Sequence, residues 1–389
     1  MTNSASAYLC GIHEHPTRHA PDKSTAQLHA ECALGALADA GLSLSDVDGY
    51  FCAGDAPGGA PIWMTDYLNL RLSWMEGTDL GGCSYIAHVG HAAAAILAGK
   101  CSVALITMAG RPRSMGPSIS LKPRAMSPER PEAAWDGPHQ STMATLFGMM
   151  AQRHMHEWGT TSAQLAAVKV AAAHHAQYNP HALLRKPVSV EDVLASSVIA
   201  DPLHKMDLCV VTDGGGAVVL TNASIARSLG RPPVKVLASA ETIHTNHGGA
   251  FDAFQMGALV TGPKVFGQAG LTPQDIQYAS IYDACTLMVI TQLEQLGFCK
   301  PGQGGGFVAE GNLIAGRGQL PWNTDGGGLC NNHPSNRGGI TKVIEAVRQL
   351  RGEAHPAVQV PDCALALVTG PGMPVGMGFN YASLILERD

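Results

Sequence analysis

The 389-residue chain has a formal net charge of -6, with 46% hydrophobic and 14% charged residues. This balance excludes disorder and leaves no polybasic surface for nucleic acid or anionic lipid. A chain of this length can bury a large core, as two domains or as one large fold of two lobes. We therefore expect a small molecule or another protein as its partner.

The first residues, MTNSASAYLCGIHEHP, lack a basic region followed by an apolar stretch long enough for a signal peptide. No uninterrupted apolar run reaches the length of a membrane-spanning helix. We therefore expect a cytoplasmic protein without a membrane partner. The ten cysteines are scattered singly, with no CxxC pair, which favours free thiols over disulfides or a metal site.

Two pairs of similar stretches occur far apart in the chain. GLSLSDVDGYFCAG from Gly41 and GLTPQDIQYASIYDA from Gly270 are each typical of a helix-ending glycine, a turn and a strand. GHAAAAILAGKCSVALITMAG from Gly90 and AVRQLRGEAHPAVQVPDCALALVTGPG from Ala346 each indicate a helix, a break and a strand that closes on glycine. Such strands are typical of a parallel sheet covered by helices on both faces. The pattern predicts a duplicated α/β fold.

The chain between the two halves has a different amino-acid composition. Residues 111–137 are rich in Pro, Arg, Ser and Met, which is typical of a loop. Residues 142–158 and 162–178 show helical periodicity, and 211–222 (VTDGGGAVVLTN) is typical of a turn leading into a buried strand. We expect this insertion to shape a ligand site. Its arginines suit phosphate groups, although a solvated loop has the same composition; they are Arg111, Arg113 and Arg124.

Cys83 lies in DLGGCSYIAHVGHAAAAILAGK, behind two glycines and ahead of a run that predicts a buried helix. A helix start brings the sulfur near unpaired backbone N–H groups, which can lower a thiol pKa from about 8.5 to as low as roughly 3.5–7.5. Cys83 is therefore either a nucleophile or a small packing residue. The local sequence is compatible with both.

His333 and Tyr282 are the other candidates for proton transfer. His333 lies among glycine-rich turns in NTDGGGLCNNHPSNRGG, ahead of a predicted helix over 340–350. Tyr282 and Asp283, in SIYDAC, follow a predicted strand at the carboxyl edge of a parallel sheet, where open α/β folds place their sites. A core histidine and a buried, hydrogen-bonded tyrosine are the alternatives. The glycines of LVTGPGMPVGMGF, from Leu367, form either a donor to an oxyanion or a plain tight turn.

Together these stretches resemble the thiolase superfamily over nearly the whole chain. Cys83 stands at the position of the family's nucleophile, and 323–339 is similar to the family's Asn-x-x-Gly-Gly…Gly-His-Pro-x-Gly-x-x-Gly. The middle of the chain, including EWGTTSAQLAAVKVAAAHHAQYNPHA and LEQLGFCKPGQGGGFV, resembles the sterol-carrier, lipid-transfer branch. The resemblance implies a thiolase fold of two related αβ halves with mixed sheets, layered α/β/α/β/α, plus an inserted loop domain. The implied domains are residues 1–110 with 206–265, residues 111–205 for the insertion, and residues 266–389.

The resemblance also implies roles for individual residues. The catalytic groups would be Cys83, His333 and Tyr282, with an oxyanion hole from Cys83, Gly370 and His333. Tyr282 or Cys330 would donate a proton, and CoA would contact Gly327 and Asn332 besides the three arginines. The implied substrate is an acyl-CoA with CoA as co-substrate, without a metal or a permanently bound cofactor. The implied partners are a second copy of the chain and a small zinc-ribbon and OB-fold subunit.

Two departures from the family pattern leave the reaction open. Val368 stands where ordinary thiolases carry their second, acid/base cysteine. Tyr282 stands where they carry Asn or His, and resembles thiolase-like aldolases, which typically lack the nucleophilic Cys and usually carry Tyr at the position of His333. Because Cys83 and His333 are both present, we predict CoA-dependent thiolytic cleavage, or the reverse condensation, of a bulky 3-oxoacyl-CoA through an acyl-cysteine. The alternatives are a retro-aldolase, a lyase acting on a 3-hydroxyacyl-CoA such as a steroid side-chain ester, and a non-catalytic subunit that binds a CoA ester or lipid.

Overall fold

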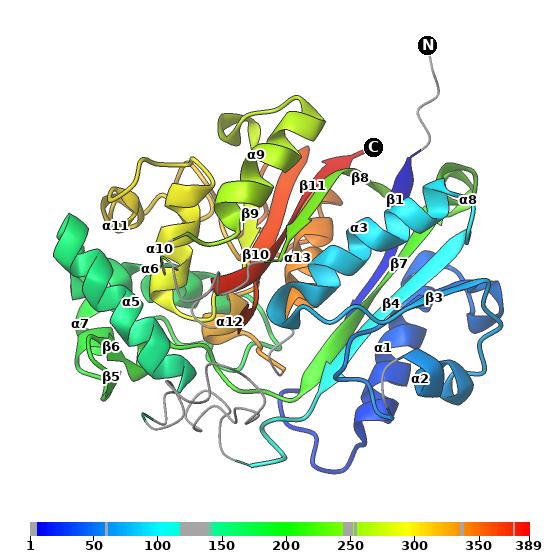
Figure 1. The fold of residues 1–389 in the computed structure, drawn as a ribbon, viewed down its shortest axis with the longest axis horizontal. Helices are drawn as coiled ribbons and strands as arrows, with labels where there is room; N and C mark the ends of the chain where they lie inside the picture. Colours follow the sequence, from blue (N-terminus) through cyan, green and yellow to red (C-terminus); the bar gives the residue numbers. More distant parts are fainter. Residues whose placement is uncertain are drawn as a thin grey trace.

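The computed structural model describes residues 6–58, 61–116, 139, 142–243, 252, 255–334, 338–375 and 378–389. Its centre is a nine-stranded mixed sheet in the order β3-β2-β4-β7-β1-β8-β11-β10-β9 (Figure 1). The strands of the first half are β1 (Ala7–Glu14), β2 (Gly49–Phe51), β3 (Trp74–Glu76), β4 (Val103–Gly110) and β7 (Gly214–Asn222). Those of the second half are β8 (Val234–Thr242), β9 (Tyr278–Ile281), β10 (Leu365–Val375) and β11 (Gly378–Arg388).

The sheet confirms the predicted duplication. In the first half, β2 is parallel to β4, and β4 and β1 each pair antiparallel with β7. In the second half, β9 is parallel to β10, and β10 and β8 each pair antiparallel with β11. The halves meet where Tyr8 and Leu9 of β1 pair with Lys235 and Val234 of β8, so that two sheets form one.

Four helices cover the sheet, α1 (Thr25–Ala40), α3 (Ser84–Leu97), α9 (Ala258–Ala269) and α13 (Gly339–Leu350). The neighbouring helices α3 and α13 share one apolar cluster with strands of both halves. Alternate β4 residues reach opposite layers, since Ala104 and Ile106 join the α3 cluster while Val103 and Leu105 join the α1 cluster. The predicted layered thiolase-type α/β architecture is therefore confirmed.

The two glycines singled out in the sequence end the helices that precede β2 and β9. Gly41 closes α1 with a φ of 73° and Gly270 closes α9 with a φ of 68°. This left-handed conformation is strained for a residue with a Cβ, which explains the glycine at both positions.

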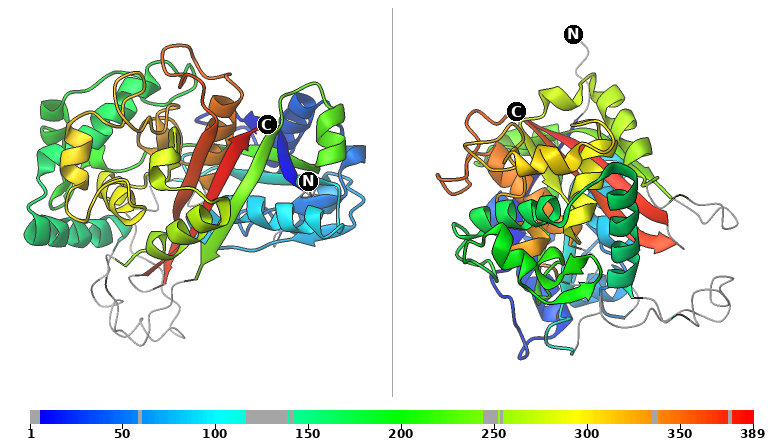
Figure 2. Two further views of the ribbon diagram at one scale, coloured as in Figure 1. Left: turned by 90° about the horizontal axis from the view of Figure 1, so that it is seen from above. Right: turned by 90° about the vertical axis from the view of Figure 1, so that its left-hand side faces the viewer.

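The insertion lies beside the second half. Its helices α5 (Met143–Trp158), α6 (Ser162–Ala176) and α7 (Val190–Leu194) begin at capping residues, and α6 contacts α10 (Thr286–Gln295) and α11 (Gly304–Ala309). Figures 1 and 2 show α5 and α6 on the side away from α1. The smaller elements are α2 (Pro61–Tyr67), β5 (Val198–Ala200), β6 (Leu203–His204), α8 (Ala223–Ser228) and α12 (Gly327–Cys330).

The proposed domain limits stay a prediction. β8 falls within the predicted first-half segment 206–265, yet it pairs over most of its length with β11 of the second half. The predicted loop 111–137 is described only up to residue 116. None of the described helices combines the length and apolar character that crossing a membrane requires.

Candidate active site

The carboxyl end of β9 places a phenol against an imidazole. The Tyr282 hydroxyl lies 2.8 Å from His333 Nε2, and the two rings meet edge to face with centroids 5.6 Å apart. The Gly338 N–H donates to the same hydroxyl at 3.2 Å. Because the phenol oxygen accepts this backbone bond, its own O–H can donate to Nε2 of a neutral imidazole.

Desolvation favours the uncharged form of both groups at neutral pH, with Tyr282 4% exposed and the His333 side chain half-buried. Desolvation, followed by the charge of Lys342, lowers the His333 pKa to about 4. Desolvation raises the Tyr282 pKa above its ordinary value of 10.0, against the smaller lowering effect of the Gly338 N–H. The His333 backbone N–H is anchored separately, to Thr212 Oγ1 at 3.0 Å. The pair is thus a neutral phenol that can pass its proton to a neutral imidazole.

Asp283, the residue after Tyr282, organises the loop that carries His333. It is fully buried and accepts hydrogen bonds of 2.8 and 3.0 Å from two successive N–H groups of α12. A Cβ on Gly327 would lie 2.3 Å from Asp283 Oδ2, so the glycine run allows this close approach. Lys342 Nζ on α13 lies 2.9 Å from Asp283 Oδ1. Asp283 therefore ties the end of β9 to both flanks of the His333 loop.

Cys83 has a different environment. It caps α3 after the short 3-10 turn Gly81–Cys83, and its exposed fraction is 0%. Gly372 lies so close that a Cβ there would come within 2.9 Å of Cys83 Sγ. Within the described residues, no hydrogen bond joins this thiol to His333 or Tyr282.

The predicted low thiol pKa is wrong for this structure. Burial raises the pKa of Cys83 above its ordinary value of 9.0, and the charge of Glu241 adds to the increase. The backbone N–H of Cys83 acts in the opposite direction with a smaller effect. Desolvation of a thiolate therefore outweighs the dipoles at the helix start.

Known proteins share this fold and much of this sequence. Residues 239–388 match the family model described as Thiolase C-terminal domain-like. The chain is 35% identical over 385 residues to the 17-hydroxy-3-oxo-4-pregnene-20-carboxyl-CoA lyase of Mycobacterium tuberculosis, covering 95% of this chain and 98% of the relative. The chain belongs to the thiolase superfamily.

Relatives with different activities belong to this superfamily. An acetyl-CoA acetyltransferase of Methanothermobacter thermautotrophicus is 32% identical over 343 residues, which cover 86% of this chain and 88% of the relative. The solved Ltp2-ChsH2(DUF35) aldolase superposes with a TM-score of 0.88 at 32% identity, over 99% of this chain and 98% of that one. The predicted thiolase-like branch is therefore confirmed, and the superfamily includes both acyltransferases and aldolases.

Two glycines of β10 lie beside the residues predicted for the thiolase oxyanion hole. A Cβ on Gly370 would lie 2.3 Å from Tyr282 Cβ, so Gly370 lies against the tyrosine, while Gly372 lies beside Cys83. Val368, at the position of the missing thiolase cysteine, is buried in the apolar cluster of α3 and α13. The oxyanion-hole roles of Cys83, Gly370 and His333 stay predictions.

Cys330 belongs to a different part of the molecule. It is fully buried in the apolar cluster of the second half and the insertion. Burial raises the pKa of its thiol, which the Lys169 ammonium partly offsets. In the part of the chain that the structure describes, no hydrogen bond connects it to Tyr282 or His333, and its role as proton donor stays a prediction.

The residues predicted to bind CoA have partners within the protein, where they are described. The guanidinium groups of Arg111 and Arg113 donate to backbone carbonyls of the 18–21 segment at 3.0–3.4 Å. Asn332 donates to a carboxylate on β1, and Gly327 packs against Asp283. Arg124 lies outside the described residues. Contact between these residues and CoA stays a prediction.

Sequence reasoning missed three groups near Tyr282. The first is the Gly338 N–H, and the second is the buried Lys342. The third is Cys209, close enough for its charge to raise the Tyr282 pKa, with its N–H bonded to Ala284 O at 3.0 Å. Of these three groups, only Lys342 gives a signal in the sequence. It is a charged residue on the helix predicted over residues 340–350, and the face of that helix that carries it must also be buried.

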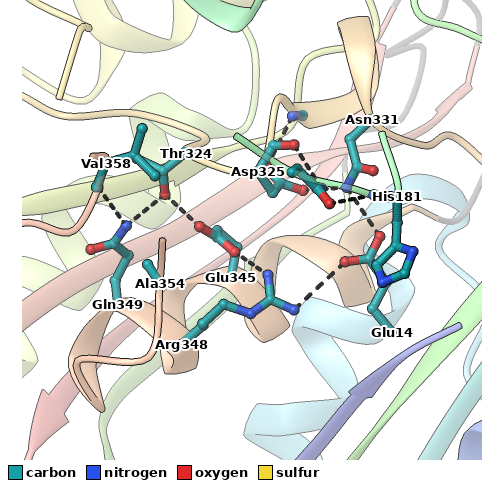
Figure 3. A network of polar contacts seen from close by, with 12 residues as sticks. Glu14, His181, Thr324, Asp325, Asn331, Glu345, Arg348, Gln349, Ala354 and Val358 are labelled. Carbon is teal, nitrogen blue, oxygen red and sulfur yellow. Dashed lines mark hydrogen bonds and ion pairs between the residues drawn. The ribbon is translucent and has the colours of Figure 1, made fainter. Parts of the chain in front are cut away.

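A cavity of about 410 Å³ lies elsewhere, between the start of the chain, the insertion and α13. Figure 3 shows Glu345 between Thr324 and Arg348, with Arg348 directed toward Glu14. Burial raises the pKa of Glu345 to about 7. Neither Tyr282 nor His333 lines this cavity, but two of its acidic residues, Glu14 and Asp325, accept hydrogen bonds from Asn331, two residues before His333.

Proposed function

We propose that this enzyme is a retro-aldolase, a lyase that cleaves the C2–C3 bond of a 3-hydroxyacyl-CoA. The observation that carries the proposal is the 2.8 Å hydrogen bond between the Tyr282 hydroxyl and His333 Nε2. Retro-aldol cleavage needs a group that removes the proton of a hydroxyl, and this pair can relay such a proton. It does not need a nucleophilic thiolate, which burial disfavours at Cys83.

The proposed reaction uses Tyr282 as a donor to a neutral His333 while its oxygen accepts from the Gly338 N–H. The Tyr282 oxygen takes the proton of the substrate's 3-hydroxyl as its own proton passes to His333 Nε2. The oxygen electrons form the new carbonyl at C3, the C2–C3 bond breaks, and its electron pair becomes the enolate of the shorter acyl-CoA. Return of the proton through Tyr282 to C2 completes the cycle, without an oxidant, a metal or free CoA.

The proposed substrate is bulky at C3. The M. tuberculosis relative is a 17-hydroxy-3-oxo-4-pregnene-20-carboxyl-CoA lyase by name, at 35% identity over nearly the whole of both chains. A steroid side-chain CoA ester with a 3-hydroxyl is therefore the class to test first. We also propose a small partner subunit, since the solved aldolase relative is named as an Ltp2-ChsH2(DUF35) assembly.

Thiolytic cleavage is the second candidate. Cys83 keeps the family's position at the start of α3, and the acetyl-CoA acetyltransferase relative is 32% identical over 86% of this chain. On this route Cys83 would attack a 3-oxoacyl-CoA, and free CoA would release the acyl group. It requires Cys83 to lose its proton, and the structure provides no hydrogen-bonded base for it among the described residues.

One assay separates these functions. Purified protein is incubated with a steroid side-chain 3-hydroxyacyl-CoA without free CoA, and separately with a 3-oxoacyl-CoA with and without CoA, and the products are identified by mass. Formation of a ketone or aldehyde and a shorter CoA ester in the first incubation supports the retro-aldolase. Cleavage only of the 3-oxo ester, and only with CoA, supports the thiolase and overturns the proposal. Binding of both esters without turnover, with the partner subunit present, points to the non-catalytic alternative.

A further inference from the structure

Lys342 is an ionisable side chain in the interior that the mechanism above leaves without a role. The residue is 2% exposed, and its ammonium lies 2.9 Å from the fully buried Asp283 carboxylate. A buried ion pair is weak evidence for stability, because desolvation of two charges offsets much of their attraction. The position of this pair calls for another explanation.

The pair lies next to the elements that carry the Tyr282–His333 hydrogen bond. Asp283 is the residue next to Tyr282, and Lys342 lies one helical turn after Gly338, whose N–H donates to the Tyr282 hydroxyl. Side chains on a helix point back toward its N-terminus, which directs Lys342 toward this same turn. The ammonium therefore lies in the layer that supports both catalytic groups.

We propose that Lys342 is a positioning residue of this site. Paired with Asp283, its buried ammonium lies beside the elements that carry Tyr282 and His333 and opposes the placement of a second positive charge on His333. The inference rests on the retro-aldolase proposal for its catalytic meaning, but the charge effect on His333 can be measured without a substrate.

Several titratable groups surround the His333–Tyr282 pair, and only one of those described carries a fixed positive charge. They come from the end of β9, the start of α3, the segment before β7 and α13, and they are Asp283, Cys83, Cys209 and Lys342. Burial favours the neutral forms of Tyr282 and of both thiols. Apart from burial, Lys342 is the one group whose charge lowers the His333 pKa.

The acidic network on the far side keeps Lys342 charged. Asp283, Asp325 and Glu14 all raise the Lys342 pKa above its ordinary 10.5, despite burial. Figure 3 shows Asp325 and Glu14 in the same polar network as Asn331, which precedes the His333 loop. The ammonium is therefore a permanent charge over the pH range in which a histidine titrates.

The test is the titration of His333 itself, read by NMR with histidine labelled at 13Cε1. The chain has 17 histidines, so His333→Gln assigns the signal. In the wild type we expect a midpoint below the ordinary 6.5, and in Lys342→Met a higher midpoint that still lies below 6.5, because burial of the ring remains. Lys342→Arg keeps the charge and serves as the matched control, with a midpoint close to that of the wild type.

A double variant separates the effect of the Lys342 charge on His333 from misfolding caused by an unpaired buried Asp283. Asp283→Asn with Lys342→Met removes both charges and leaves no lone buried ion, and we expect it to raise the His333 midpoint as well. A midpoint that stays at the wild-type value in the folded double variant overturns the proposal. So does a Lys342→Arg variant that shifts as far as Lys342→Met. The acid limb of the pH–activity profile should move with the midpoint, which a purely structural role for Lys342 would not produce.

Discussion

The start of α3 and the end of β9 contribute two adjoining but opposite environments to this site. Cys83, at the start of α3, is fully buried without a hydrogen-bonded base among the described residues. Tyr282, after β9, is also buried but bonds to His333 and to the Gly338 N–H. The difference shows that a residue in a family's catalytic position is not thereby activated. Activation depends on the polar groups that the fold brings beside it.

The substitution Tyr282→Phe gives the strongest test of this contrast between Cys83 and Tyr282. Removing the hydroxyl removes the proton relay, and loss of general acid–base catalysis typically costs about 10²- to 10⁴-fold in rate. We expect kcat/KM for the 3-hydroxyacyl-CoA to fall within this range. Tyr67→Phe, on a tyrosine that is 53% exposed on α2, is the matched control and should leave the rate unchanged. Near-normal activity in Tyr282→Phe would remove the phenol from the mechanism.

The second prediction contrasts two glycines of β10. A Cβ on Gly370 would lie 2.3 Å from Tyr282 Cβ, so Gly370→Ala should displace the tyrosine. A misplacement of about 1 Å can cost roughly 10²-fold in rate. Gly372→Ala meets Leu80 O and Cys83 Sγ instead, so we expect it to lower the melting temperature while keeping more of the activity. Rates are compared per folded molecule. A larger loss of activity in Gly372→Ala than in Gly370→Ala would indicate that Cys83, and not Tyr282, carries the chemistry.

The third prediction concerns Cys83 itself. Cys83→Ala should cleave the 3-hydroxyacyl-CoA within a few-fold of the wild type, with a stability loss of about 1 kcal/mol from the buried site. Because burial raises its thiol pKa, Cys83 should react with iodoacetamide more slowly than the half-buried Cys299. An activated nucleophile at Cys83 would give the reverse order. First labelling at Cys83, or loss of cleavage in Cys83→Ala, would restore the thiolase route.

The smallest expected effect concerns His91 on α3, a histidine whose pKa is raised, in contrast to that of His333. His91 contacts Glu76 and lies 2.9 Å from Glu241, and these carboxylates raise its pKa from 6.5 to about 10. The folded protein therefore holds this proton more tightly than the unfolded chain, so its stabilising contribution is complete below pH 6.5 and is lost as the pH rises through about 10.

Denaturant unfolding of His91→Gln checks this sign. The site is partly exposed, so we expect a loss of about 1 kcal/mol at neutral pH. The difference from the wild type should shrink on approach to pH 10. His333→Gln should show the opposite trend, because the lowered pKa of His333 destabilises the folded protein as the pH falls from 6.5 toward 4. If the difference in unfolding free energy between His91→Gln and the wild type stays constant from neutral pH to pH 10, the charge of His91 does not act on stability.

Much of the fold was predictable because it rests on local signals. The glycines that end α1 and α9, the alanine-rich run of α3 and the glycine-ended strand β10 all appear as patterns of neighbouring residues. The repetition of these patterns predicted the duplication, and the same stretches predicted the superfamily. The joining of the two sheets through β1 and β8 had no such signal, because pairing between strands distant in sequence depends on the packing of the whole chain.

The sequence by itself determined which residues lie at the strand and helix ends, and so named Cys83, Tyr282 and His333 together. Only the tertiary structure decided how each is protonated. The helix start visible in the sequence allowed an activated thiol at Cys83, since dipole effects are local, whereas desolvation depends on every residue packed around the sulfur. The same holds for His333, whose neutral form depends on burial and on a lysine from another element. Charge state is a property of the assembled interior, and the proposed choice of phenol over thiol chemistry rests on it.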